Sequence, residues 1–126
     1  MPSMKSSDLR IGNLADLGNR IAKVTEINHL ACVVVDLEET QDTIEDYERV
    51  KGIILTEEWL LKFGFELDIE DDGYSKGKYK ASVSDEGCIF FIYDSYYPIE
   101  ICEFKYIHQL QNLYFALTGE ELILNI

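Results

Sequence analysis

The sequence has few of the residues that support disulfide frameworks or metal sites. Its 126 residues include three cysteines and two histidines. Cys32, Cys88 and Cys102 are an odd number at wide spacing, whereas a disulfide framework favours an even and dense set. We therefore expect reduced, buried thiols. A zinc site needs four converging ligands, and no second short-spaced pair accompanies His29 and Cys32. The sequence predicts no metal site and no cofactor.

Long hydrophobic runs are also missing. No run approaches the roughly 18 to 20 apolar residues that span a bilayer. The N-terminal segment MPSMKSSDLR is polar and lacks the apolar core of a signal peptide. These absences predict no membrane contact and a cytoplasmic location.

Basic residues are scarce. Lys and Arg number 11 against 24 Asp and Glu, a net charge of −13. The densest acidic segment, residues 36–48, holds seven acids and no base. Because phosphate binding needs clustered Lys and Arg, we expect no direct nucleic-acid binding. The acidity is compatible with a solvated face, with docking onto a basic partner, or with mimicry of nucleic-acid charge by segment 36–48.

What is present begins with short strands. β-Rich residue types and the turn signals DLGN and NH delimit LRIGNL, RIAKVTEI and LACVVVDL. The run CVVV is continuous rather than alternating, which indicates a strand covered on both faces. We expect the acidic segment to be a loop, followed by a strand within YERVKGIIL. These N-terminal strands resemble an SH3-like small barrel.

The segment LTEEWLLKFGFEL predicts a helix of about two turns. Thr56 is a good N-cap, and the two glutamates after it complement the positive end of the helix dipole. Gly64 suits the left-handed C′ position, after which Phe65 can fold back on the helix. The expected core face is formed by Trp59, Leu60 and Phe63.

A second antiparallel meander follows this helix. The strands FELDI, KYKASV, CIFFIY and IEI are separated by turn signals. In the first of them, Phe65, Leu67 and Ile69 alternate onto one face. Pro98 cannot donate a ladder hydrogen bond, so we expect it before the last of these strands or on an edge. The chain is expected to close with a strand in LILNI.

The last helix is expected from about Tyr106 to Leu117, ending at Gly119. At 100° per residue, its apolar side chains form a stripe about 120° wide that packs on the sheet. The stripe consists of Tyr106, Ile107, Leu110, Leu113, Tyr114 and Leu117.

Phe115 lies opposite this stripe, with His108, Gln111 and Asn112 around it. A large aromatic on an otherwise polar helix face has two explanations. Either the N-terminal strands cover this second face of the helix, or the four residues form a contact surface for a partner or ligand. The four are therefore the candidate site residues.

Catalytic and ligand-binding motifs are not found. Phosphate-cradling glycine loops and a G-x-S-x-G elbow are missing. The segment DIEDDG, residues 68–73, matches the start of a calcium loop, but its position 12 is Tyr79 rather than a bidentate Glu. We expect this segment to be a turn, and we predict that the protein is not an enzyme.

Three segments carry a resemblance. LRIGNL, LTEEWLLKFGF and HQLQNLYFALTGEEL resemble a group of small uncharacterised proteins encoded by gut anaerobic bacteria and by their phages and mobile elements. The resemblance touches both ends and the middle of the chain, whereas segment 36–48 is interpreted as variable connecting sequence. It supplies no catalytic residues. It implies a cytoplasmic accessory protein in a phage or mobile-element context.

Together these observations predict an α+β fold of antiparallel β-meanders with one short and one longer helix. Residues 1–126 are expected as a single domain, with a division into lobes of about 8–55 and 56–126 left open. The leading functional hypothesis is a non-catalytic interaction protein acting on a host protein. The alternatives are a small-ligand binder, for a nucleotide or signalling molecule, and an acidic nucleic-acid mimic.

Overall fold

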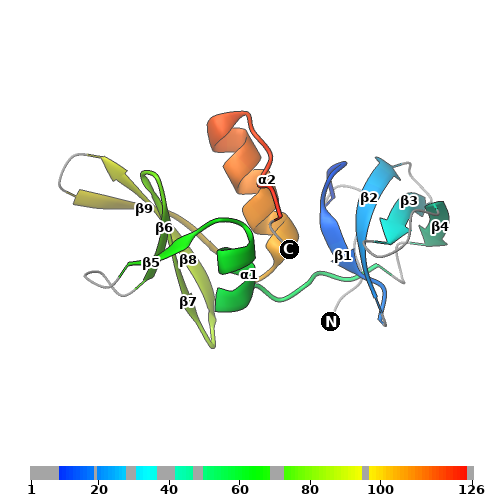
Figure 1. The fold of residues 1–126 in the computed structure, drawn as a ribbon, viewed down its shortest axis with the longest axis horizontal. Helices are drawn as coiled ribbons and strands as arrows, with labels where there is room; N and C mark the ends of the chain where they lie inside the picture. The colour runs from blue at the N-terminus through cyan, green and yellow to red at the C-terminus, as the bar shows by residue number, and fades with distance from the viewer. Residues whose placement is uncertain are drawn as a thin grey trace. The chain divides into compact units, whose positions relative to one another are not determined.

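The chain divides into two compact units (Figure 1). Unit 1 comprises Met1–Ile53 and Tyr106–Glu121, and unit 2 comprises Ile54–Lys105 and Leu122–Ile126. The computed structural model describes residues 9–18, 20–27, 31–36, 42–46, 50–68, 73–94 and 97–124. The longer helix thus belongs with the N-terminal strands, from which about 50 residues of unit 2 separate it in sequence. The expectation of a single domain over residues 1–126 stays a prediction.

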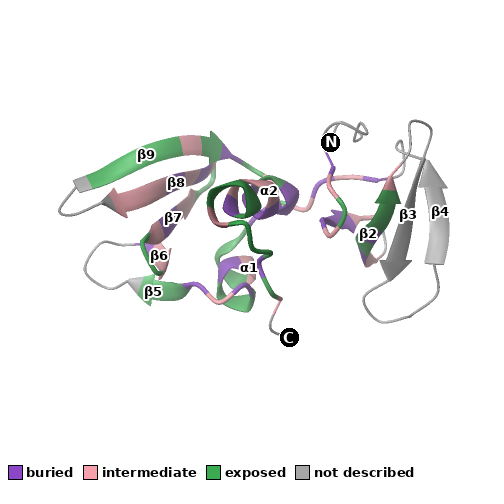
Figure 2. Cartoon of the chain, turned by 90° about the horizontal axis from the view of Figure 1, so that it is seen from above, coloured by how far each residue is buried: buried purple, intermediate pink, exposed green. Residues whose placement is uncertain are grey.

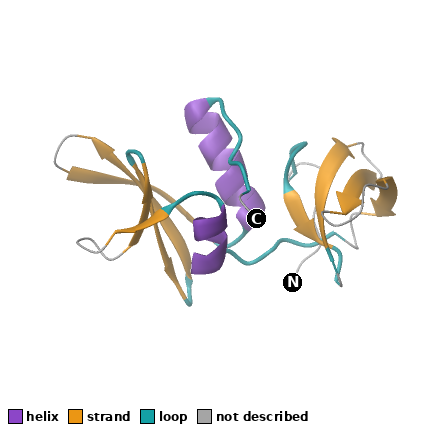
Figure 3. Ribbon diagram, in the orientation of Figure 1, coloured by secondary structure: helices purple, strands orange, loops and turns teal. Residues whose placement is uncertain are grey.

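The predicted α+β fold is confirmed (Figure 3). In its described part, unit 1 contains β1 (Leu14–Asp16), β2 (Ile21–Ile27), β3 (Ala31–Asp36), β4 (Asp42–Asp46) and α2 (Ile107–Thr118). In its described part, unit 2 contains α1 (Glu57–Lys62), β5 (Glu66–Asp68), β6 (Gly73–Lys76), β7 (Tyr79–Ser84), β8 (Gly87–Asp94) and β9 (Tyr97–Phe104).

Each unit has one antiparallel sheet whose strands follow one another in chain order. The order is β1-β2-β3-β4 in unit 1 and β5-β6-β7-β8-β9 in unit 2. Every neighbouring pair of these strands is antiparallel, so both predicted meanders are confirmed. The likeness of the first sheet to an SH3-like barrel stays a prediction.

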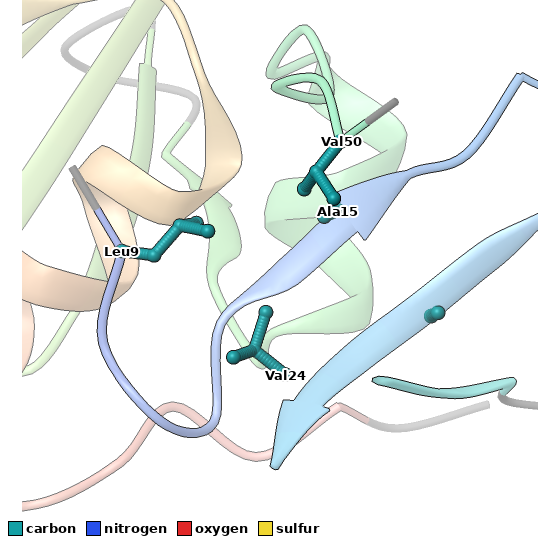
Figure 4. Close-up of a cluster of buried hydrophobic side chains, with 5 residues drawn as sticks. Leu9, Ala15, Val24 and Val50 are labelled. Carbon is teal, nitrogen blue, oxygen red and sulfur yellow. The ribbon is translucent and has the colours of Figure 1, made fainter. Parts of the chain in front are cut away.

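Among the described residues of unit 1, one buried cluster consists largely of small apolar side chains. This cluster joins the segment before β1, the first two strands and the segment after β4, through Leu9, Ala15, Ala22, Val24 and Val50. Figure 4 shows the side chains of Leu9, Val24 and Val50 gathered around β1. Burial alternates along the first half of β2, with Ala22 and Val24 inside and Lys23 exposed, as a half-covered strand requires.

The core of unit 2 is largely aromatic, and its buried residues include members of α1, β7 and β8 (Figure 2). Phe90 is fully buried and its ring lies 5.8 Å from that of Tyr79 and 6.4 Å from that of Phe104. On the same face of the sheet as Phe90, Tyr74 donates a hydrogen bond from its hydroxyl to Glu57 of α1 at 2.9 Å. The short helix therefore covers the face that carries Phe90.

Both helices end where their residue types predict. In α1, Thr56 is the N-cap, and Gly64 has φ 89° with Phe65 donating its N–H to the Leu60 carbonyl at 3.0 Å. Of the predicted core face, Leu60 and Phe63 are buried and Trp59 is half-buried. In α2, Gly119 is the left-handed C-cap with φ 74°. At the start of this helix, Gln109 Oε1 accepts a hydrogen bond from the Tyr106 N–H at 3.0 Å, a contact that was not predicted.

Several strand boundaries differ from the predictions. β1 starts at Leu14, because residues 10–13 form a turn in which Asn13 donates its N–H to the Arg10 carbonyl. β4 lies inside the acidic segment that was expected to be a loop, where its backbone pairs with β3. In the described part of YERVKGIIL, the expected strand is replaced by two single bridge residues, Lys51 and Ile54, of which Lys51 pairs with Asp16. Of the expected closing strand, the described residues Leu122–Leu124 have no strand conformation.

Two predicted faces are also corrected. Leu67 is 59% exposed although Phe65 is buried, because β5 begins only at Glu66 and Phe65 belongs to the turn that ends α1. Leu117 is 38% exposed at the last turn of α2.

Residues 69–72 of the calcium-like segment lie outside the described ranges, as do the side chains of segment 36–48. Pro98 lies in the edge strand β9, as expected.

Candidate interaction surface on unit 1

The side chain of Gln111 connects α2 to the turn before β1 through hydrogen bonds. Its side chain is buried, and its Oε1 accepts a hydrogen bond from the Leu14 N–H at 2.9 Å. Its Nε2 donates to the Gly12 carbonyl at 3.2 Å. Because Leu14 is buried as well, the carboxamide satisfies a backbone N–H that is shielded from water. Gln111 therefore has a packing role.

The turn over residues 10–13 presents polar groups to the helix. Gly12 has φ 100°, a backbone conformation that favours glycine. Asn13 is buried, and its Oδ1 accepts a hydrogen bond from the Arg10 N–H at 2.6 Å. Its Nδ2 donates to Asn112 Oδ1 at 2.8 Å. The Asn13 side chain thus bonds the turn to itself and to α2.

Arg10 lies on the outer side of these contacts. Its Nε donates to Asn112 Oδ1 at 3.1 Å, and its Nη2 donates to the Gln111 carbonyl at 3.3 Å. Nη1 and Nη2 each donate to one oxygen of the Glu121 carboxylate. A planar guanidinium suits this two-point contact with a carboxylate. All three nitrogens of the Arg10 guanidinium thus donate hydrogen bonds, which fix the orientation of the group.

The guanidinium of Arg10 also lies over the ring of Phe115. Its Cζ is 4.3 Å from the ring centre, within the range of a cation–π contact. Phe115 remains 39% exposed, and Ile11 beside Arg10 is 57% exposed. We define the Arg10–Phe115 surface as Arg10, Ile11, Asn112, Phe115 and Glu121. It combines exposed apolar side chains with one opposite-charge pair.

His108 belongs to the interior rather than to this surface. It is buried, and its ring stacks on that of Tyr106 with centroids 5.7 Å apart and planes 15° apart. Gly52 packs closely on both rings, since an added Cβ there would lie 2.8 Å from the Tyr106 ring and 3.2 Å from His108. The predicted site residue His108 is part of the packing at the start of α2.

N-terminal residues cover the polar helix face only in part, and a contact surface on the remainder stays a prediction. N-terminal residues cover the part of the face that carries Gln111, while Asn112 is half-buried and Phe115 is exposed. The predicted set omitted Arg10, Ile11 and Glu121. A local signal for the turn existed in Gly12, but no residue pattern indicated that this turn lies against a helix about 100 residues later.

Other kinds of site have little support in the described residues. Within these ranges, no group of three or more His, Cys, Asp and Glu could hold a metal ion. No helix in the same ranges is long and apolar enough to cross a membrane. Cys88 is buried and Cys102 is half-buried, and both are free. The side chain of Cys32 lies outside the described residues.

The thiol of Cys88 is strongly perturbed. Burial, and then the neighbouring Cys102, raise the pKa of Cys88 to about 12. Burial also raises the pKa of Cys102. A raised pKa lowers the thiolate fraction, which is the nucleophilic form. These cysteines have the properties of core residues and not of activated nucleophiles.

Comparison with protein families, with curated proteins and with solved structures gives no match to this chain. The fold is that of an α+β protein with two antiparallel meanders. Side-chain hydrogen bonds, such as that from Asn13 to Asn112, join α2 to the N-terminal turn.

Proposed function

We propose that the protein is a non-catalytic interaction protein that binds a partner protein through the Arg10–Phe115 surface. The observation that carries the proposal is an exposed aromatic ring beneath a guanidinium that is fixed by Glu121 and Asn112. Aromatic and arginine side chains dominate the binding energy of protein interfaces. Side chains that are already ordered lose less entropy when a partner binds.

The resemblance to small proteins of gut anaerobic bacteria and their phages and mobile elements supports the choice of partner. We infer that an accessory protein of that origin would act on machinery of the cell that it enters. We therefore propose a cytoplasmic host protein as the partner, and an apolar or aromatic anchor of that protein as the group that contacts Phe115 and Ile11.

The small-ligand alternative has weaker support. It required His108, Gln111 and Asn112 to supply hydrogen bonds to a base stacked on Phe115. Gln111 is committed to Leu14 and Gly12, and His108 is buried against Tyr106. The acidic-mimic alternative depends on segment 36–48, whose side chains lie outside the described residues, so neither alternative is proposed.

The test compares two variants with nearly equal exposure on the same helix. Phe115 is 39% exposed and Leu117 is 38% exposed, but residues two apart on a helix point about 200° apart. Once capture from host lysate has identified a partner, we expect Phe115→Ala to weaken its binding by about 30-fold, the effect of a strong interface residue. Leu117→Ala should change the Kd by less than about twofold.

Equal weakening by the two variants would contradict the proposed surface, because it would indicate a general loss of α2. Hydrolysis of nucleotides, esters or peptides by the purified protein, abolished by one point mutation, would contradict the non-catalytic proposal. Thermal unfolding of each variant should be measured beside binding, so that loss of fold is separated from loss of contact.

A further inference from the structure

The outer edge of β9 in unit 2 is a second feature that packing does not explain. β9 spans eight residues and ends the sheet order, with β8 as its neighbour. No strand in the ranges that the structure describes pairs with the other edge of Tyr97–Phe104. Directly after β9, the Leu55 N–H donates to the Lys105 carbonyl at 2.9 Å. A free edge of this length exposes backbone N–H and C=O groups that can pair with another strand.

The register of β9 separates its side chains into two kinds. Residues paired directly across a sheet point to the same face. Ile99 pairs with Ile92 and Cys102 with Phe90, so Ile99 and Cys102 lie on the face that carries the aromatic core. Glu100 pairs with Phe91 and Glu103 with Ile89, which places both carboxylates on the opposite face. The strand is apolar on one face and acidic on the other.

The side chains along this edge are open to solvent. Ile99 is 51% exposed and Ile101 is 37% exposed, while Glu100 and Glu103 are both exposed. Ile101 is the extra residue at the register shift, so the bulge adds a second isoleucine to the edge. Pro98 lacks an N–H, which restricts pairing to the segment from Ile99 onward.

We propose that this edge accepts an extended segment of a partner protein in which basic and apolar residues alternate. Such a segment would extend the sheet by one strand, with main-chain hydrogen bonds supplying affinity and alternate side chains supplying specificity. Its apolar side chains contact Ile99 on one face, and its basic side chains contact Glu100 and Glu103 on the other. The net charge of −13 adds attraction for a basic segment over long range.

A second copy of this chain is the less favourable occupant. Two β9 edges paired around a twofold axis perpendicular to the sheet would bring both pairs of carboxylates, Glu100 and Glu103, onto one face. Like charges opposite each other destabilise a strand pair. The acidic row therefore favours a basic partner over self-pairing.

The test uses capped synthetic peptides of about nine residues, long enough to span the strand. One peptide alternates Lys and Val, a second alternates Glu and Val, and a third is the Lys–Val peptide with every backbone nitrogen N-methylated. We expect the first to bind at least about tenfold more tightly than the others and to slow amide hydrogen exchange from Ile99 to Phe104. N-methylation keeps the charge but removes donors, so it separates strand pairing from general attraction.

Matched charge variants complete the test. Glu100→Lys with Glu103→Lys should weaken binding of the Lys–Val peptide by about tenfold. Asp85→Lys with Glu86→Lys makes the same change in net charge at the exposed β7–β8 turn and should leave binding within about twofold. Equal effects of the two double variants, equal binding of the N-methylated peptide, or no protection of β9 amides would overturn the proposal. Phe115→Ala should leave peptide binding unchanged, so failure here is distinct from failure at the Arg10–Phe115 surface.

Discussion

Gln111 is a buried polar residue of α2, and the backbone groups that it contacts explain why a polar side chain is found there. Both ends of its carboxamide are hydrogen-bonded to the turn before β1, one to the Leu14 N–H and one to the Gly12 carbonyl. A buried donor that loses its partner keeps the full desolvation penalty, which exceeds the net gain of an ordinary hydrogen bond. We therefore expect replacement of Gln111 by an apolar residue of similar size to destabilise the protein.

We predict that Gln111→Leu lowers the free energy of unfolding by about 2 kcal/mol, because the buried Leu14 N–H is left without an acceptor. Urea unfolding followed by circular dichroism measures the change. Gln109→Leu on the same helix is the matched control. Gln109 is exposed and accepts a hydrogen bond from the Tyr106 N–H, so we expect a loss of about 1 kcal/mol or less. A larger loss from Gln109→Leu than from Gln111→Leu would contradict this account.

Cys88 makes stability depend on pH in the alkaline range. Its pKa rises from an ordinary value of 9.0 to about 12 in the folded state, chiefly because the thiol is buried. Between these values the unfolded chain releases this proton and the folded chain keeps it. Stability is therefore fully present below pH 9 and falls as pH rises toward 12, at about 1.4 kcal/mol per pH unit from this group.

The measurement is the free energy of unfolding from pH 8 to about 11, compared between the wild type and Cys88→Ala. The variant is expected to be less stable at pH 8, because it removes buried volume, but to lose less stability as pH rises. Cys102→Ala should keep most of the wild-type slope, because Cys102 is only half-buried. Parallel slopes for wild type and Cys88→Ala would show that the Cys88 thiol does not titrate differently in the two states.

At the scale of the element, helix ends were predictable because their signals are local. Gly64 and Gly119 each act within one turn of the helix they end, and Thr56 occupies the predicted N-cap position, although its side chain makes no cap hydrogen bond. The hydrogen bond from the Tyr106 N–H to Gln109 escaped prediction because tyrosine is not among the usual N-cap residues.

Strand positions and faces were less predictable, because pairing decides them and composition does not. β4 contains three acids, which are poor strand formers, yet it forms because β3 needs partners for its backbone groups. Leu67 follows the alternation of its segment but is exposed at the edge strand β5. A single sequence shows alternation and does not show which face another element covers.

The candidate surface was half predictable for the same reason. Helical periodicity placed Phe115 and Asn112 on a common face away from the leucines, and this arrangement is observed. Periodicity could not identify Arg10 or Glu121, since the contacts between Arg10 and the helix join residues about 100 positions apart. Periodicity also could not show that Gln111 is buried and Phe115 is exposed. This difference arises because the turn over residues 10–13 covers Gln111 and leaves Phe115 open.

At the scale of the whole molecule, unit 1 is discontinuous in sequence. In its described part, the buried cluster of the N-terminal segment consists largely of alanines and valines, which bury little area, and α2 supplies the side chain that satisfies the Leu14 N–H. We predict that a fragment of residues 1–55 does not fold cooperatively, because it lacks this helix. Circular dichroism and thermal denaturation of the fragment measure this directly.

A fusion of residues 1–53 to residues 106–121 is the matched control, and it should unfold in one cooperative transition. The Ile107 N–H donates to the Ile53 carbonyl at 2.8 Å, so a flexible linker of roughly four residues can join the two segments without displacing α2. In the fusion, Gln111→Leu should again be destabilising, since the bond it removes lies wholly within unit 1. A folded fragment of residues 1–55, or an unfolded fusion, would show that α2 is not the element that completes this unit.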